Sequence, residues 1–244
     1  MKNRCKLALA VFLFLSTTAF AQYEIASSVA SGEALFQSNF SAINSTLLNS
    51  YSKKKATSEK PLALTPSKLK ALDFSRSSSI SEKIKKLFIN QITQANPSAQ
   101  PKLEQLFANN RLVTEFDSLL AGNGFSGRNL ADALTAYLVI NWQVANNQEF
   151  NDPNGFNNVR QVMRVALLSS EELADLQDRD KQTIAETMAY QSLIMRTAYQ
   201  DLKKANNRTG LANLQKIVHK SVKDLGFDLK AVRLTSAGFV KKAR

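Results

Sequence analysis

The sequence has very little of the two residue types that most often build reactive sites. Among its 244 residues there is one cysteine, Cys5, and one histidine, His219. Cys5 lies before the first apolar run and not at its end, so it is not placed as the lipid-bearing cysteine of a lipoprotein, and the rest of the chain can form no disulfide. A single histidine excludes a histidine-based metal cluster and leaves one residue for any pair of nucleophile and histidine.

Long apolar runs and common catalytic motifs are also missing. The longest N-terminal apolar run, residues 7–15, is less than half of the roughly 20 residues that a membrane-spanning helix needs. There is neither a glycine-rich phosphate loop nor a serine nucleophile elbow. Acidic residues at 171–180 lack the order of a calcium-binding loop, and the preference of carboxylates for helix starts explains them more simply. We therefore expect no metal and no cofactor, and we favour a protein without enzymatic activity.

The N-terminus carries the pattern of a secretory signal peptide. Its basic residues Lys2, Arg4 and Lys6 precede the apolar run, and Ala19-Phe20-Ala21 follows it with small residues two apart. These are the three parts of an exported precursor, so we expect cleavage after Ala21 and a mature chain that begins at Gln22. The predicted location is the bacterial periplasm or the outside of the cell.

The positive charge is concentrated at the C-terminal end. The chain has a formal net charge of +12, yet residues 22–202 contain 18 basic and 18 acidic residues, whereas the last 42 contain 11 basic and 2 acidic ones. On an ideal helix over 209–225, Lys216, Lys220 and Lys223 lie opposite the apolar stripe, and His219 faces solvent beside them. This basic face either aids solubility or binds an anionic envelope component. Nucleic acid is not an expected partner, because no binding motif accompanies the charge.

Composition divides the chain into three parts. After the signal peptide, residues 22–78 are rich in Ser, Asn, Ala and Lys and are expected to be a low-complexity segment, with 50–62 as its disordered part. Regular helical periodicity begins at Ser79. We expect one helical domain over 79–240, with a single hydrophobic core.

Apolar residues spaced by three and four predict a series of helices. The predicted helices cover residues 79–96, 101–121 with a break near 109–110, 126–146, 157–168 after a turn at 151–155, 171–176, 180–204 and 209–225. Ser79 and Glu82 predict a capping box, and Ser126 is the expected cap of the third helix. Gly226 ends the last one, and residues 232–234 are expected to be extended. The fold class is all-α, an irregular bundle of six or seven helices.

Two carboxamides fall inside apolar stripes. Helical projection places Asn141 in the stripe of the 126–146 helix and Gln191 in that of the 180–204 helix. A buried amide needs a hydrogen-bond partner, so these residues either fix the register of the helices or line a small polar pocket. Tyr137 and Trp142 are close to Asn141 in sequence and would form the aromatic wall of such a pocket, which makes Tyr137, Asn141, Trp142 and Gln191 the candidate ligand-binding residues.

Three segments resemble a known family. They are the run Ala131-Asp132-Ala133-Leu134-Thr135-Ala136-Tyr137-Leu138-Val139-Ile140-Asn141-Trp142, the step Ala189-Tyr190-Gln191 and the ending Val232-Arg233-Leu234-Thr235-Ser236-Ala237-Gly238-Phe239. They are similar to a family of exported bacterial proteins that is classed only as a domain of unknown function. The resemblance covers residues 74–240. It implies a secreted helical domain and supplies no reaction, substrate or catalytic residue.

These observations favour one function over a second. The first is a non-enzymatic exported module that binds a protein partner or an envelope component. The alternative is a small-molecule binder or an enzyme with a pocket around Tyr137, Asn141 and Gln191.

Overall fold

The computed structural model describes residues 64–169 and 176–242. The expected signal peptide, residues 22–63 and most of the helical turn expected at 171–176 lie outside these described residues. Within them, eight α-helices and one two-stranded hairpin confirm the expected all-α bundle. The helices are α3 (Pro66–Lys70), α4 (Ser78–Ala95), α5 (Gln100–Leu106), α6 (Arg111–Ala121), α7 (Leu130–Asn146), α8 (Pro153–Leu168), α10 (Asp178–Lys204) and α11 (Arg208–Asp224).

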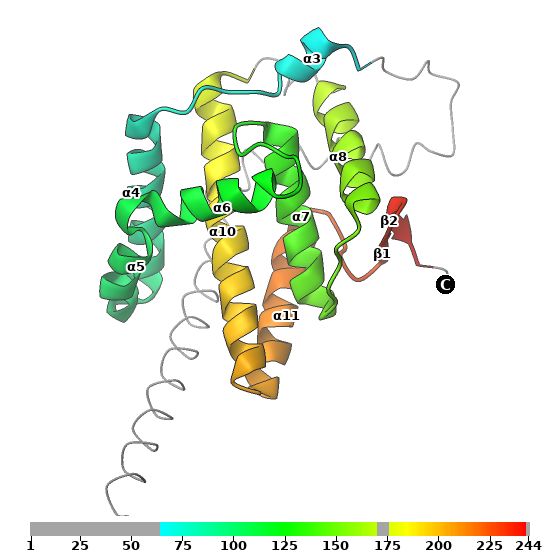
Figure 1. The fold of residues 1–244 in the computed structure, drawn as a ribbon. Helices are drawn as coiled ribbons and strands as arrows, with labels where there is room; N and C mark the ends of the chain where they lie inside the picture. Colours follow the sequence, from blue (N-terminus) through cyan, green and yellow to red (C-terminus); the bar gives the residue numbers. More distant parts are fainter. Residues whose placement is uncertain (1–63, 170–175, 243–244) are drawn as a thin grey trace, which may run out of the picture.

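Helix α7 lies at the centre of the bundle because its sequence is apolar on nearly every side. Of its 17 residues, 14 are buried. A helix of this kind is stable only when neighbours cover it all round. Helices α10, α11 and α8 supply that cover, while α6 crosses in front of α10 in Figure 1 and ends beside α7. The core is therefore built around α7 and the long helix α10.

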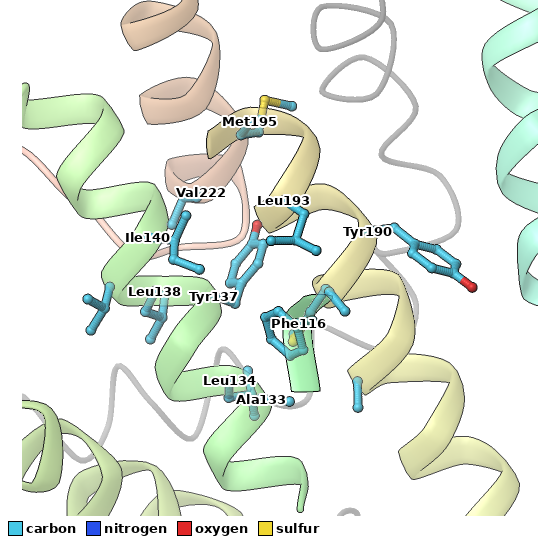
Figure 2. Packing of buried hydrophobic residues seen from close by; sticks show 14 of the residues in the cluster. Phe116, Ala133, Leu134, Tyr137, Leu138, Ile140, Tyr190, Leu193, Met195 and Val222 are labelled. Carbon is cyan, nitrogen blue, oxygen red and sulfur yellow. The ribbon is translucent and has the colours of Figure 1, made fainter. Parts of the chain in front are cut away.

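An aromatic cluster joins α10 to α4 and to the end of α5. The ring of Tyr190 packs edge-on against Phe107, with 4.7 Å between the ring centroids, and against Phe88 at 5.6 Å. In Figure 2, Tyr190 points away from α7, whereas Tyr137 of α7 lies on the other side of α10, beside Leu193. Helix α10 thus separates two parts of the core, one toward α7 and one toward α4.

Helices α7 and α8 each begin four residues from the expected start. Helix α7 begins at Leu130, because Asn129 and not Ser126 is its N-cap and accepts a hydrogen bond from the N–H of Asp132 at 3.1 Å. Helix α8 begins at Pro153, four residues before the expected start at 157. Asp152 caps it, and proline at the first helical position has its φ already set for the helix. The expected turn at 151–155 is correspondingly shorter.

Helix α4 begins one residue early and without the expected capping box. Its N-cap is Ser77, which makes no side-chain capping bond. The carboxylate of Glu82 lies 3.5 Å from the ammonium of Lys85, and the hydroxyl of Ser79 lies 3.0 Å from that of Ser77. The break at 109–110 and the end at Gly226 are confirmed, because Asn109, Asn110 and Gly226 all have positive φ.

The segment before α4 packs with the helical domain, N-terminal to the start expected at Ser79. Leu72 and Phe74 are each 5% exposed and belong to the hydrophobic core. The N–H of Phe74 donates to the carbonyl of Arg128 at 3.0 Å, and the N–H of Leu130 donates to the carbonyl of Leu72 at 2.9 Å. Residues 72–74 therefore hold the loop that precedes α7.

The described C-terminal residues form a β-hairpin. The sequence predicted only its first strand, as an extended segment at residues 232–234. Strands β1 (Val232–Thr235) and β2 (Gly238–Lys241) pair antiparallel. Gly238 has φ +85°, and an added Cβ would lie 3.3 Å from the backbone nitrogen of Val159, so glycine suits this position. The indole of Trp142 donates to the carbonyl of Val232 at 3.2 Å, and Asn158 donates to that of Ser236 at 2.8 Å. The hairpin is thus fixed to α7 and α8.

Candidate functional site

The four predicted ligand-binding residues are all buried in the core. Tyr137, Asn141, Trp142 and Gln191 are between 1% and 7% exposed. The amide nitrogen of Asn141 donates to the carbonyl of Tyr137 at 2.8 Å within the same helix, and Tyr137 points from α7 toward α10 in Figure 2. The burial expected for both amides is therefore observed. None of the four residues lines the cavities described in the following paragraphs, and a pocket around them remains a prediction.

The basic face of α11 is partly neutralised by neighbouring acids. Lys216, Lys220 and Lys223 are exposed as expected. However, Lys220 forms an ion pair with Asp224, and the ammonium of Lys223 lies 3.6 Å from the carboxylate of Asp228. A role for these lysines at an anionic surface remains a prediction.

The expectation that His219 faces solvent is wrong. Its side chain is 19% exposed, and Nε2 lies 3.2 Å from Oδ1 of Asp228. Burial is the main reason why the pKa of His219 lies below its ordinary value. The segment after α11 folds back over the imidazole, which the helix projection alone could not show.

Two adjoining cavities open between α6, α7, α10 and the loop before α8. The first has a volume of about 150 Å³ and the second of about 420 Å³. They share the lining residues Ile140, Gln143, Asn151 and Arg196. We name the two together the amphipathic groove, because phenylalanines line one end, charged side chains line the other, and Arg196 lines both. The larger cavity falls within the usual range of ligand pockets, roughly 300 to 1,000 Å³.

The apolar end of the groove is lined by three phenylalanines. Phe125 precedes α7, Phe150 precedes α8, and Phe156 lies in the first turns of α8. Phe150 and Phe156 pack edge-on with 5.4 Å between their centroids, and both are only partly buried. The guanidinium of Arg160 lies over the ring of Phe125, 4.5 Å from its centroid, and stabilises the position of this ring. Partly exposed rings in a concave surface suit an apolar ligand.

The charged end of the groove is built on α10. Arg196 is half-buried and, among the described residues, forms no ion pair. Lys203 lies about two turns further along α10. Its ammonium is 3.5 Å from the carboxylate of Glu149 and 5.1 Å from the ring centroid of Tyr199. The Tyr199 hydroxyl donates to Asn147 at 2.7 Å, which fixes the ring. Arg196 is thus the cation of the groove that is available to a ligand.

A buried polar network lies nearer the N-terminal end of α10 than the groove does. Glu186, in the N-terminal half of α10, is 1% exposed. Its Oε1 accepts hydrogen bonds from Ser81 at 2.8 Å and Gln182 at 2.9 Å, and lies 3.1 Å from Nε of Arg76. Its Oε2 has no hydrogen-bond partner within the described part of the chain. Burial, only partly offset by these donors and by Arg76, raises the pKa of Glu186 above its ordinary value.

The same network ties α4 and α6 to α10. Arg76 donates to both carboxylate oxygens of Asp117 on α6, at 2.6 and 3.1 Å, and to the carbonyl of Gly127 at 3.2 Å. The amide of Gln182 makes two hydrogen bonds, each 2.8 Å long, to the backbone of Ser77 at the start of α4. These contacts close the bundle around its core, so the network is structural and contributes no side chain to the groove.

The Glu186→Gln variant is expected to change how stability depends on pH. A carboxyl whose pKa is raised by folding contributes most to stability below its unfolded value of 4.5, and this contribution is lost as pH rises through the folded value. The melting temperature of the natural protein, measured relative to that of the variant, should therefore fall as pH rises from 4 toward neutrality. Thermal unfolding of both proteins in matched buffers checks this, since the other carboxylates titrate in both. A difference that is constant or rises with pH would contradict it.

Neither a metal cluster nor a membrane span is found within residues 64–169 and 176–242. No group of three or more His, Cys, Asp and Glu side chains is arranged to hold a metal ion there. No helix of this part is both long enough and apolar enough to cross a membrane.

The fold and the groove together define a helical domain with an open amphipathic cavity. The chain belongs to DUF6683, a family of unknown function, which it matches over residues 3–242. This confirms the resemblance to a domain of unknown function, and the match extends N-terminal to the expected residues 74–240. No curated protein and no solved structure matches the chain.

Proposed function

We propose that this protein is an exported, non-enzymatic binding protein that holds an amphipathic anion in the groove between α6, α7 and α10. The observation that carries the proposal is the pairing of an aromatic end, formed by Phe125, Phe150 and Phe156, with the unpaired cation Arg196. Burying the apolar part of such a ligand contributes roughly 25 cal/mol for each Å² removed from water, and the guanidinium fixes its charged end.

The arrangement of the groove favours binding over catalysis. Besides aliphatic side chains it has phenyl rings, carboxamides, a guanidinium, an ammonium and the hydroxyls of Thr135 and Tyr199. The carboxylate that lines it, Glu149, is exposed and lies beside Lys203. Groups of this kind orient and desolvate a ligand, whereas acid–base catalysis needs titratable groups with matched pKa values. An anionic lipid of the cell envelope has the required chemistry.

Export is part of the same proposal and rests on the N-terminal pattern of basic, apolar and small residues. A ligand from the envelope would be met in the periplasm or outside the cell. Recovery of protein that begins at Gln22 from the periplasm or the medium would support this part, and recovery of uncleaved protein from the cytosol would contradict it.

Dodecanoate tests the groove, since it combines an apolar chain with a carboxylate. Below its micelle concentration it should bind saturably to the natural protein, and dodecyltrimethylammonium of equal chain length should bind more weakly. Arg196→Gln should weaken dodecanoate binding by about tenfold or more, because a charge-assisted hydrogen bond contributes about 1.5 to 3 kcal/mol. Calorimetric titration of both ligands gives the affinities.

Two variants separate the ends of the groove. Phe156→Ala should weaken both ligands, whereas Arg196→Gln should remove the preference for the anion. Arg208→Gln, on the exposed face of α11, is the matched control and should leave both affinities unchanged. Absence of saturable dodecanoate binding, or equal binding by Arg196→Gln and the natural protein, would overturn the proposal.

A further inference from the structure

A third cavity, separate from the amphipathic groove, lies where α3 meets α8 and the start of α7. Its volume is about 250 Å³, and it shares no lining residue with the groove. Three cationic side chains line it, Lys70, Arg160 and Arg164, together with the carboxylates of Asp73 and Asp132. A small cavity with this many charged groups is polar enough to hold a hydrophilic ligand. Whether that ligand is an anion or a cation depends on which of these side chains are already paired within the protein.

Both carboxylates of this cavity already accept hydrogen bonds within the protein, and only that of Asp132 is paired with a cation among the described residues. The two oxygens of Asp132 accept from Nε and Nη2 of Arg160 at 2.5 and 2.7 Å, and Oδ2 also accepts from the N–H of Ser126 at 2.8 Å. Oδ1 of Asp73 accepts from the amide of Asn129 at 2.7 Å. Arg160 and Asp132 therefore neutralise each other within the protein.

Arg164 is a cation of this cavity that has no acidic partner among the described residues. Its Nε is enclosed and has no hydrogen-bond partner, and among the described residues it forms no ion pair. Burial first, and then the nearby charge of Arg160, lower the pKa of Arg164. Lys70 likewise forms no ion pair within residues 64–169 and 176–242. Two cations that form no ion pair among the described residues thus line one open cavity, Arg164 partly buried and Lys70 exposed.

From this geometry we infer that the cavity is a binding site for a small oxyanion, held by Arg164 with Lys70 as the second cation. A planar guanidinium presents its donors in a fork that matches phosphate and carboxylate oxygens, and Lys70 adds a point charge. Asp73 and Asp132 limit the site to small ligands, because a larger or more highly charged anion would approach their carboxylates. Binding here is independent of the ligand proposed for the groove.

Inorganic phosphate is the first probe. Titrated into the full-length protein at constant ionic strength, with chloride as the reference anion, it should bind saturably. Arg164→Gln should weaken this binding by about tenfold or more, and Lys70→Gln by a smaller factor. Acetate, titrated in the same way, distinguishes a phosphate site from a carboxylate site. Arg111→Gln, at an exposed position of α6, is the control and should bind like the natural protein.

Melting temperatures distinguish a loss of anion binding from a loss of folding. Because Arg164→Gln removes a cation without an acidic partner, its melting temperature in chloride should equal or exceed that of the natural protein. Arg164→Lys keeps the charge, loses the fork and should bind with intermediate affinity, which provides a second measurement if the glutamine variant does not fold. Absence of saturable binding of both anions, or unchanged phosphate binding by Arg164→Gln and Arg164→Lys, would overturn the inference. Dodecanoate binding should be unaffected in these variants.

Discussion

The Arg76→Met variant should lose about 3 to 5 kcal/mol of unfolding free energy at neutral pH, because it leaves the Glu186 carboxylate buried without its cation. Glu186 is 1% exposed, and Arg76 is the only cationic group of the described residues that forms an ion pair with it. The variant also removes the two hydrogen bonds from Arg76 to Asp117 and the one to the carbonyl of Gly127. Methionine keeps the length of the side chain, so the loss is mainly electrostatic.

Chemical denaturation with urea measures this loss, and a double variant identifies its cause. Arg76→Met combined with Glu186→Gln should be clearly more stable than Arg76→Met alone, since a neutral amide needs no counter-ion. Arg111→Met, at an exposed position of α6, should change stability by less than about 0.5 kcal/mol. If the double variant is no more stable than the single one, the buried charge is not the cause.

The Asp132→Ala variant should lose a similar amount, about 3 to 5 kcal/mol. Asp132 is fully buried, and its removal leaves the guanidinium of Arg160, 18% exposed, without its paired carboxylate. The N–H of Ser126 also loses its acceptor, which loosens the loop before α7. For a domain of this size the melting temperature should fall by roughly 2 to 4 °C for each kcal/mol.

A surface carboxylate provides the control for this prediction. Asp180 lies 3.2 Å from the guanidinium of Arg179, but both side chains are exposed, so Asp180→Ala should lose less than about 1 kcal/mol. Asp132→Asn retains one acceptor oxygen and the shape of the side chain, and should fall between the two. Equal melting temperatures for Asp132→Ala and Asp180→Ala would contradict the assigned role.

Helix positions could be predicted where the signal is local to each helix. The apolar run of α7, the asparagines at 109–110 and the glycine at 226 act within a few residues, and the structure confirms them. The start of α7 was misplaced because distant residues determine it. The backbone of 128–130 is hydrogen-bonded to 72–74, so Ser126 lies in a fixed loop and Asn129 becomes the cap. No local pattern reports a contact across more than fifty residues.

Burial could be predicted better than the sites could. Helical projection placed Asn141 and Gln191 in the core, where they lie. The groove could not be predicted, since its lining comes from α6, α7, α8, α10 and the loops between them, which only the packing brings together. Gln182 and Glu186 are spaced by four on α10, so a shared face was visible in the sequence, but its burial depends on Arg76 and Ser81 from another segment.

Tryptophan fluorescence can report whether the C-terminal hairpin is attached to α7. Trp142 is the single tryptophan of the chain, it is 3% exposed, and its indole nitrogen is bonded to the carbonyl at the start of β1. All indole fluorescence therefore originates at the junction of α7 with this hairpin. Detachment of β1 and β2 would expose the indole to water and shift its emission to longer wavelength. No other part of the chain contributes tryptophan emission.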